Sequence, residues 1–267
     1  MKYSALFILV ILTSCEKKYS VEETEEALDS LIEEQKSLET PFDKNLQLAR
    51  KGDATAMFNL GHFYSKGKGV EADDKKAFEW WKKAADLNYT SAIHNVLWAY
   101  QKERGVKKNK IEEMKYVKLS AENGNESLYL YLAFQYQYGT GVIKNEKQAF
   151  RWISKAYESG NKKAVSFLAD CYDRGTGVEE NATRAVELYE EAAFAGEKRG
   201  VSSLRVRYGM GETKNYKRKL MWDLIYGALE GEYVDLDRYK KWHKVTQTDI
   251  DEATEEAERI IESVKFY

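Results

Sequence analysis

Histidine and cysteine are the side chains of this sequence best suited to metal binding or nucleophilic chemistry, and the chain has only 3 His and 2 Cys. His62 and His94 can approach each other if neighbouring segments stack. Neither belongs to a set of Cys, Asp or Glu with the spacing of metal ligands. We therefore expect solvated or peptide-contacting imidazoles and no metal site.

Motifs for nucleophilic catalysis and phosphate binding are also missing. No Ser occurs in Gly-x-Ser-x-Gly, and no Gly-rich segment has the Walker or dinucleotide-binding form. Cys171 precedes Tyr172, a position close to the core pattern described below, which favours a packed thiol over a catalytic one. The pair Asp73-Asp74 stands at an expected helix start, where the helix dipole favours acids. The sequence predicts no catalytic residue and no cofactor, so we do not expect an enzyme.

Composition indicates which elements position these side chains. The 267 residues include 42 Lys or Arg and 44 Asp or Glu, and this balance lacks the basic excess of a nucleic-acid-binding protein. A hydrophobic content of 43% and an aromatic content of 13% exclude a disordered chain. One Pro and 17 Gly are typical of helices joined by short turns. The chain is predicted to be all-α.

The same chemistry returns every 36 residues, five times, between about Asp53 and Gly231. In the first helix of each unit, an aromatic position recurs, and four residues before it lies an apolar one. Spacings of three and four place such positions on one helix face. A second helix repeats a large side chain followed four residues later by a small one. The positions are Tyr64, Tyr100, Tyr136, Tyr172 and Tyr208; Leu60, Val96, Leu132, Leu168 and Leu204; Trp80, Tyr116, Trp152, Leu188 and Leu224; and Ala84, Ser120, Ala156, Ala192 and Ala228.

A glycine turn joins the two helices of each unit. The segments 67–70, 139–142 and 175–178 are nearly identical, and Gly supplies the left-handed conformation that closes a helix. A few residues later, an Asp or Asn recurs whose side-chain oxygen can cap the second helix. These predicted caps are Asp73, Asn109, Asn145 and Asn181.

The pattern resembles the Sel1 repeat, a relative of the tetratricopeptide repeat. The first unit carries it in the segment Ala56 to Tyr64, in the turn Gly67 to Val70, and in Asp73, Ala77 and Ala84-Ala85. The first, third and fourth units match strongly, whereas the fifth is degenerate. The resemblance implies helix pairs stacked into a right-handed α-solenoid, and it implies no chemistry by itself.

The N-terminus reads as a targeting segment. Lys2 is followed by eight apolar residues, too few to span a bilayer but sufficient for the apolar region of a signal peptide. The following Leu12-Thr13-Ser14-Cys15 resembles a bacterial lipobox, which implies cleavage before Cys15 and its acylation with palmitate-like chains. An ordinary signal peptide followed by a coincidental Cys is the alternative. In the enterobacterial lipoproteins that this segment resembles, an Asp after the acylated Cys usually retains the protein at the inner membrane. By that resemblance Glu16 implies the outer membrane, with the chain on its periplasmic or surface face.

The ends of the chain are predicted to cover the repeats. An amphipathic helix from about Val21 to Glu39 and a second helix at Asn45–Lys51 precede the first unit. After the last unit, Asp249–Lys265, with Thr248 as N-cap, carries an apolar face suited to a terminal cap, and Asp235–Val245 forms a short linking helix. The expected organisation is a signal peptide at 1–14, an acylated and capping N-terminus at 15–52, repeats at 53–232 and capping helices at 233–267.

Non-recurring positions on the first helices are free to bind a partner. In the related tetratricopeptide family, the positions two before and two after the Leu60 phase face the concave groove. By this resemblance the chain presents a mainly aromatic strip on its first three units, followed by the more polar Ser166, Asp170 and Ser202. The alternative is that Trp98 and Phe134 pack against neighbouring helices. The predicted partner-binding residues are Phe58, His62, His94, Trp98, Leu130 and Phe134.

These features predict a lipid-anchored scaffold or adaptor that binds a protein or peptide in the cell envelope. Its expected partners are that protein and the bilayer, through acylated Cys15, and not nucleic acid. Two alternatives come from the resemblance. Envelope Sel1 lipoproteins include immunity proteins that neutralise type VI secreted effectors, and some Sel1 proteins with regularly paired cysteines were described as β-lactamases or penicillin binders. This chain lacks those pairs, which disfavours a cell-wall or β-lactam hydrolase.

Overall fold

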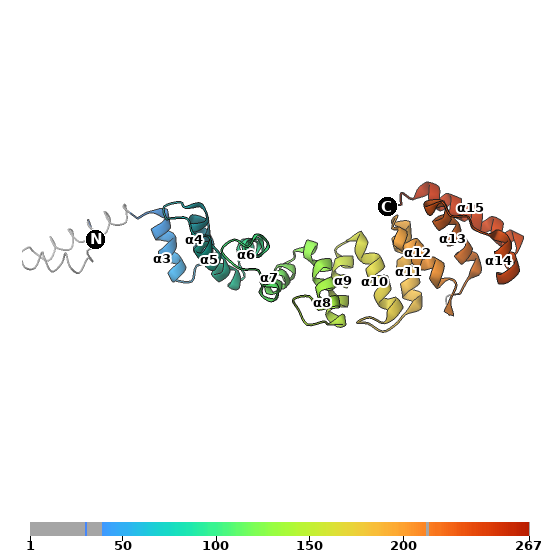
Figure 1. Cartoon of the computed structure of the whole chain (residues 1–267), viewed down its shortest axis with the longest axis horizontal. Helices are drawn as coiled ribbons and strands as arrows, with labels where there is room; N and C mark the ends of the chain where they lie inside the picture. Colours follow the sequence, from blue (N-terminus) through green and yellow to red (C-terminus); the bar gives the residue numbers. More distant parts are fainter. Residues whose placement is uncertain (1–29, 31–38, 212–213, 267) are drawn as a thin grey trace, which may run out of the picture. The chain divides into compact units, whose positions relative to one another are not determined.

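The computed structural model describes residues 30, 39–211 and 214–266, and in these residues the regular structure is entirely helical. Cys15, the predicted signal peptide and almost all of the predicted helix from Val21 to Glu39 lie outside the described residues. Among the residues described, no helix has both the length and the apolar character required to cross a bilayer. The all-α prediction is confirmed (Figure 1).

The helices follow one another through short turns. Most are 10 to 13 residues long, about three turns each. Their bounds are α3 Pro41–Arg50, α4 Ala54–Lys66, α5 Asp74–Asp86, α6 Thr90–Lys102, α7 Lys110–Glu122, the 3₁₀ turn η1 Glu126–Leu128, α8 Tyr129–Tyr138, α9 Glu146–Glu158, α10 Lys162–Arg174, α11 Ala182–Phe194, α12 Lys198–Arg207, α13 Tyr216–Glu230, α14 Leu236–His243 and α15 Gln247–Ser263.

The chain divides into two compact units. The first runs to Asn95 and also includes Glu103–Val106, while the second contains Val96–Lys102 and the chain from Lys107 onward. Successive helices pack in pairs inside each unit, α4 with α5 in the first and α8 with α9 and α10 with α11 in the second. The boundary falls within α6, so the helix pairs and not the units reproduce the sequence period.

The recurring apolar positions form the core. The Leu60 phase is buried in all five repeats, at exposures of 0 to 5%, and burying such a side chain stabilises the fold by about 1.5–3 kcal/mol. The small residues Ala84, Ser120, Ala156 and Ala192 are also buried, at 0 or 1%. They allow paired helices to approach closely, as the 36-residue pattern predicts.

The predicted caps of the second helices are confirmed. The side-chain oxygens of Asp73, Asn109, Asn145 and Asn181 accept hydrogen bonds from backbone N–H groups three residues later, at 2.9 to 3.2 Å. Each bond satisfies one of the unpaired donors of a helix start, and losing such a cap costs about 1 kcal/mol. The caps therefore fix where each second helix begins.

In the second, third and fourth repeats, the glycine at the second turn position packs against the preceding repeat. A Cβ on Gly177 would overlap the carbonyl group of Glu146 in α9, and one on Gly105 would overlap that of Asp74 in α5. Gly141 approaches α7 similarly, through Lys110. Because φ at these three glycines is also positive, between 71° and 76°, no other residue satisfies both the backbone conformation and the close approach.

The 36-residue register stops at Tyr208. Asn145 and Asn181 each donate a backbone hydrogen bond to a Tyr carbonyl oxygen nine residues earlier, at 2.8 Å. Asn215 makes the same 2.8 Å bond to Tyr208, only seven residues earlier, and caps α13. The turn is two residues shorter here, so the assignment of Leu224 and Ala228 to the core phases is wrong.

The shortened turn changes which residues of the fifth unit are buried. Ala228 is exposed and Leu224 only half-buried. Trp222, fully buried, occupies the phase of Trp152, and the buried Gly227 occupies the phase of Ala85, Ala121 and Ala193. A deletion that keeps both helices shifts every side chain after it by two positions.

The helices that flank the repeats, α3 and α15, each begin with a capping box, and each begins at a residue other than the predicted one. Helix α3 starts at Pro41 and not at Asn45, because Thr40 accepts a hydrogen bond from the Asp43 N–H while Asp43 reaches back to Thr40. Helix α15 is capped in the same way by Thr246 and Asp249, so Thr248 is not its N-cap. The buried face of α15 is as expected and packs on α13.

Candidate partner-binding surface

Three predicted binding residues, Phe58, His62 and His94, lie in the first of the two compact units, and two of them pack partly against their own repeat. The rings of Phe58 and His62 lie 4.5 Å apart, and Phe58 also contacts Tyr89 at 5.1 Å. The His62 ring lies 5.5 Å from that of Trp81. Both side chains are half-buried, whereas His94 is exposed. Phe58 and His62 therefore expose only part of their rings to a partner.

His62 lies among aromatic and amide side chains. Burial, with a smaller contribution from Lys66, lowers the pKa of His62, so its ring is neutral at pH 7. Its Nε2 lies 3.5 Å from the amide nitrogen of Asn95. In the part of the chain that the structure describes, no three His, Cys, Asp or Glu side chains are grouped as metal ligands.

The other three predicted binding residues belong to the second compact unit. Trp98 is 38% exposed, and Leu130 and Phe134 are half-buried. Phe134 packs edge to face on Phe167 of the next repeat, with ring centroids 4.9 Å apart. Phe134 thus meets the alternative raised by the sequence, contact with a neighbouring helix, while keeping part of its surface accessible.

A cavity of about 190 Å³ lies beside Phe134, between the α8–α9 and α10 helices. Its lining includes the apolar side chains Ala149, Ile153 and Cys171, and the rings of Phe134 and Phe167. Ala149, Ile153 and Cys171 are almost completely buried, at 2 to 5% exposure. The cavity therefore has an apolar floor with two aromatic rings beside it.

Charged groups also line the cavity. Asp170 accepts a hydrogen bond from the Tyr189 hydroxyl at 2.6 Å and pairs through its other oxygen with Arg199 of α12. The Arg199 guanidinium lies 4.5 Å from the Phe167 ring centroid, a cation–π contact. Burial and the bond to Asp170 raise the pKa of Tyr189, which stays protonated as the donor. These contacts fix Phe167 and Arg199 relative to α10.

Ser166 does not reach the surface. The sequence placed it with Asp170 in a polar half of the groove, but it is completely buried and donates a 2.8 Å hydrogen bond to Glu197. The same helix face therefore contributes Phe167 and Asp170, and not Ser166, to the cavity. That part of the polar half is wrong, because Glu197 comes from the start of the next repeat and covers Ser166.

Cys171 is the thiol in the cavity lining. It is 5% exposed, and burial, with a smaller effect of Asp170, raises its pKa to about 12. A thiol that stays protonated at neutral pH is a poor nucleophile and behaves as a small apolar side chain. This buried position agrees with the sequence prediction of a packed thiol.

A second hollow, of about 450 Å³, lies against the end of the last repeat. At its side, the buried Asp223 accepts hydrogen bonds from Arg205 and Lys219, both at 2.6 Å, and from the hydroxyl of Tyr239. Burial alone would raise the pKa of Asp223, but the bonds from Lys219, Tyr239 and Arg205 outweigh it and lower the pKa. The ionised carboxylate joins α12, α13 and α14.

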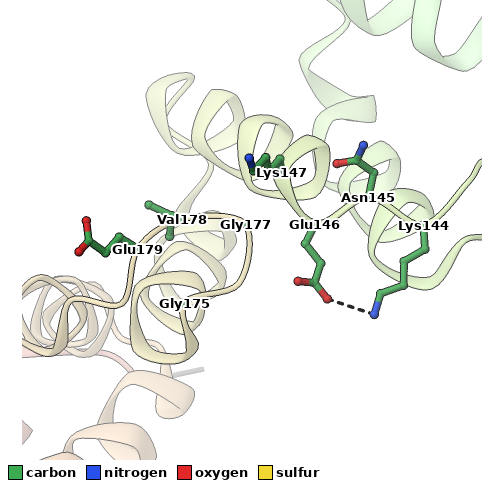
Figure 2. A pocket seen from close by; sticks show the side chains of 8 residues that line it. All are labelled: Lys144, Asn145, Glu146, Lys147, Gly175, Gly177, Val178 and Glu179. Atoms are coloured by element: carbon green, nitrogen blue, oxygen red, sulfur yellow. Dashed lines mark ion pairs between the residues drawn. The ribbon is translucent and has the colours of Figure 1, made fainter.

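Figure 2 shows a third hollow, of about 620 Å³, between the start of α9 and the turn after α10. Lys144 and Glu146 form an ion pair of 3.1 Å on one side, and Glu179 lies on the other. Lys147 also lines it, so two positive and two negative side chains balance. This hollow has no preference for one sign of charge and gives no reason to place a ligand there.

The sequence missed Phe167, Arg174 and Arg199 around the cavity. Phe167 stands one position before Leu168 in the repeat, at a phase where the first two units carry Asn59 and Asn95. The available signal was that this phase changes from Asn in the first two units to an aromatic ring, Tyr131 and Phe167, in the third and fourth. Arg174 and Arg199 had no such sequence signal, because their position at the cavity depends on how α10 and α12 pack.

Comparison with known proteins identifies the family to which these repeats belong. The family profile described as Sel1 repeat matches residues 54–89, 128–161 and 162–196, which correspond to the first, third and fourth units. A Sel1 repeat protein from Oxalobacter formigenes is 31% identical, over 70% of this chain and 77% of that one, with a TM-score of 0.41. This chain belongs to the Sel1 repeat family. The matched repeats are those that the sequence pattern identified as strongest.

Other solved structures resemble this Sel1 repeat protein. A protective antigen of uropathogenic Escherichia coli is 24% identical, over 80% of this chain and 48% of that one, with a TM-score of 0.50. An immunity protein from Pseudomonas aeruginosa is 20% identical, over 76% and 81% of the two chains, with a TM-score of 0.35. The comparison with curated protein sequences found no match.

Proposed function

We propose that this Sel1 repeat protein is a scaffold or adaptor that binds a protein partner through the first helices of its repeats. Family membership supports protein binding, and the cavity between Phe134 and Phe167 is the observation that carries the proposal. Half-exposed rings over an apolar floor are the features that provide most binding energy at protein interfaces. The polar clusters around Asp170 and Asp223 hold helices together, so we assign binding and not catalysis to this surface.

Replacing the rings of Phe134 and Trp98 tests this function. In affinity capture from cell envelopes, Phe134→Ala and Trp98→Ala are each expected to reduce recovery of the partner at least tenfold, since truncating an interface anchor costs about 2 kcal/mol or more. Trp242→Ala, which removes a 69% exposed ring on α14, is the matched control. Equal recovery by all variants, with unchanged helical circular dichroism, would reject the binding surface.

We also propose that acylated Cys15 anchors the chain in the cell envelope, with Glu16 favouring the outer membrane. The lipobox-like segment Leu12 to Cys15 supports this, and two or three acyl chains are sufficient for stable anchoring. Cys15→Ser is expected to abolish incorporation of radiolabelled palmitate and to release the protein from the membrane fraction. Cys171→Ser should do neither. Labelling that persists in Cys15→Ser would contradict the anchor.

A further inference from the structure

The cavity beside Phe134 has the size of one side chain. Its volume is about 190 Å³, and an apolar cavity of about 150 Å³ in another protein accommodates benzene. Ala149, Ile153 and the protonated thiol of Cys171 offer an occupant no charged partner. An apolar side chain gains free energy by leaving water for this floor, whereas a charged one loses its hydration.

The rings beside the cavity favour an aromatic occupant. Phe134 and Phe167 meet at an interplanar angle of 82°, the edge-to-face arrangement that aromatic rings prefer. A third ring can extend this arrangement, and such ring pairs contribute to binding beyond the area that they bury. Arg199 covers part of Phe167 and keeps that ring in place.

The charges at the cavity favour acidic neighbours for that ring. Asp170 is the one carboxylate in the lining, and both its oxygens are engaged, by Tyr189 and Arg199. Arg199 is therefore neutralised. Arg174 is exposed, and within the described residues no carboxylate is paired with it. The lining keeps one uncompensated positive charge, which a carboxylate can neutralise through a bidentate pair.

We propose that this cavity receives an aromatic side chain of a partner protein whose flanking residues are acidic, with a flanking carboxylate pairing with Arg174. The inference rests on the proposed protein-binding function and gives the chemistry of the partner. The Phe134 and Phe167 rings contact the guest ring, and Arg174 selects against basic flanks.

Blocked tripeptides test the chemistry without the natural partner. The purified full chain, labelled with ¹³C at isoleucine methyl groups, is titrated with acetylated and amidated Asp-Phe-Asp, Lys-Phe-Lys and Asp-Ala-Asp. The Ile153 methyl signal reports the cavity floor. We expect Asp-Phe-Asp to shift this signal with a Kd at least tenfold lower than that of Lys-Phe-Lys, and Asp-Ala-Asp to leave it unchanged. Equal affinities for all three, or no movement of the Ile153 signal, would overturn the proposal.

Substitutions separate the two parts of the recognition. Arg174→Gln is expected to remove the tenfold preference for acidic flanks while Phe-containing peptides still bind. Cys171→Met fills the cavity and is expected to weaken both Phe peptides at least fivefold. Arg151→Gln, which removes an exposed charge from α9 away from the cavity lining, should change neither. A preference that survives Arg174→Gln would show that this arginine does not select the flanks.

Capture experiments distinguish failure of this proposal from failure of the protein-binding function. If a partner that depends on Phe134 is recovered equally by Cys171→Met and Arg174→Gln, the chain binds protein but not through a ring in this cavity. If no partner depends on Phe134, the protein-binding surface fails, whatever the tripeptides do.

Discussion

Glu197 shows how one longer side chain redirects a repeated position. It stands at the phase of Asp53 and Asn161, whose short side chains cap α4 and α10. At the start of α12, Glu197 makes no side-chain cap and instead accepts the hydrogen bond from buried Ser166. Its second carboxylate oxygen is buried without a hydrogen-bond partner. One extra methylene therefore exchanges a cap within the helix for a contact between repeats.

This burial predicts an unusual pH dependence. Burial raises the pKa of Glu197 above its ordinary value of 4.5, and Asp170 adds to the effect. The folded chain then binds more protons than the unfolded chain at pH values just above 4.5, so the contribution of Glu197 to stability falls as the pH rises through that window. Urea unfolding between pH 4 and 7 is expected to show wild type losing stability relative to Glu197→Gln. Glu158→Gln, at an exposed position, controls for the lost charge, and parallel curves for wild type and Glu197→Gln would contradict the prediction.

At the scale of elements, the two glycines of the turn after α10 have different tasks. Gly175 ends α10 in the left-handed conformation, and a Cβ there would lie 3.5 Å from the nearest atoms, an ordinary contact. Gly177 also has positive φ, but its Cβ would overlap the Glu146 carbonyl group of the preceding repeat. The first glycine closes a helix, and the second lets one repeat dock on another.

Alanine substitutions distinguish these tasks. Gly175→Ala is expected to cost about 1–2 kcal/mol of unfolding free energy, because only the backbone conformation is strained. Gly177→Ala adds a steric overlap with backbone and should cost about 3 kcal/mol or more. Denaturant unfolding of both variants gives the comparison. Equal losses would mean that the approach of Gly177 to α9 does not limit stability.

At the scale of the whole molecule, the array needs covered ends. Helix α15 buries Ile250, Ala253, Ala257 and Ile260, and packs on α13 of the last repeat. Its other face is strongly acidic, which suits contact with water. Stability in a repeat array is approximately a sum of repeats and their nearest-neighbour contacts, so α15 protects chiefly the repeat that it touches.

Truncation should therefore act locally. A chain ending at Thr246 loses α15, and hydrogen exchange in α13 is expected to accelerate at least tenfold, while α4 and α5 in the first unit keep their protection. Hydrogen exchange with mass spectrometry resolves the segments. A chain ending at Ser263 keeps α15 and serves as control. Equal acceleration throughout the chain would show one cooperative unit instead of an array.

Much of the fold was predictable from the sequence because its interactions are local and repeated. Helix faces follow from spacings of three and four, and the caps Asp73, Asn109, Asn145 and Asn181 contact backbone only three residues away. The register of the fifth repeat was not predictable in this way. Its shorter turn is compensated by Asn215, which caps α13 by accepting from the Arg218 backbone N–H and donates its own N–H to the Tyr208 carbonyl oxygen.

The sequence by itself determined an all-α chain of paired helices, its core positions and its family resemblance, since a repeated short-range pattern reveals itself by recurrence. Only the tertiary structure decided that Ser166 is buried under Glu197, that Phe134 meets Phe167, and that Arg199 neutralises Asp170 beside a cavity. Those contacts join non-recurring side chains of different repeats. Their geometry depends on side-chain length and on how closely helices approach, which no spacing along the chain specifies.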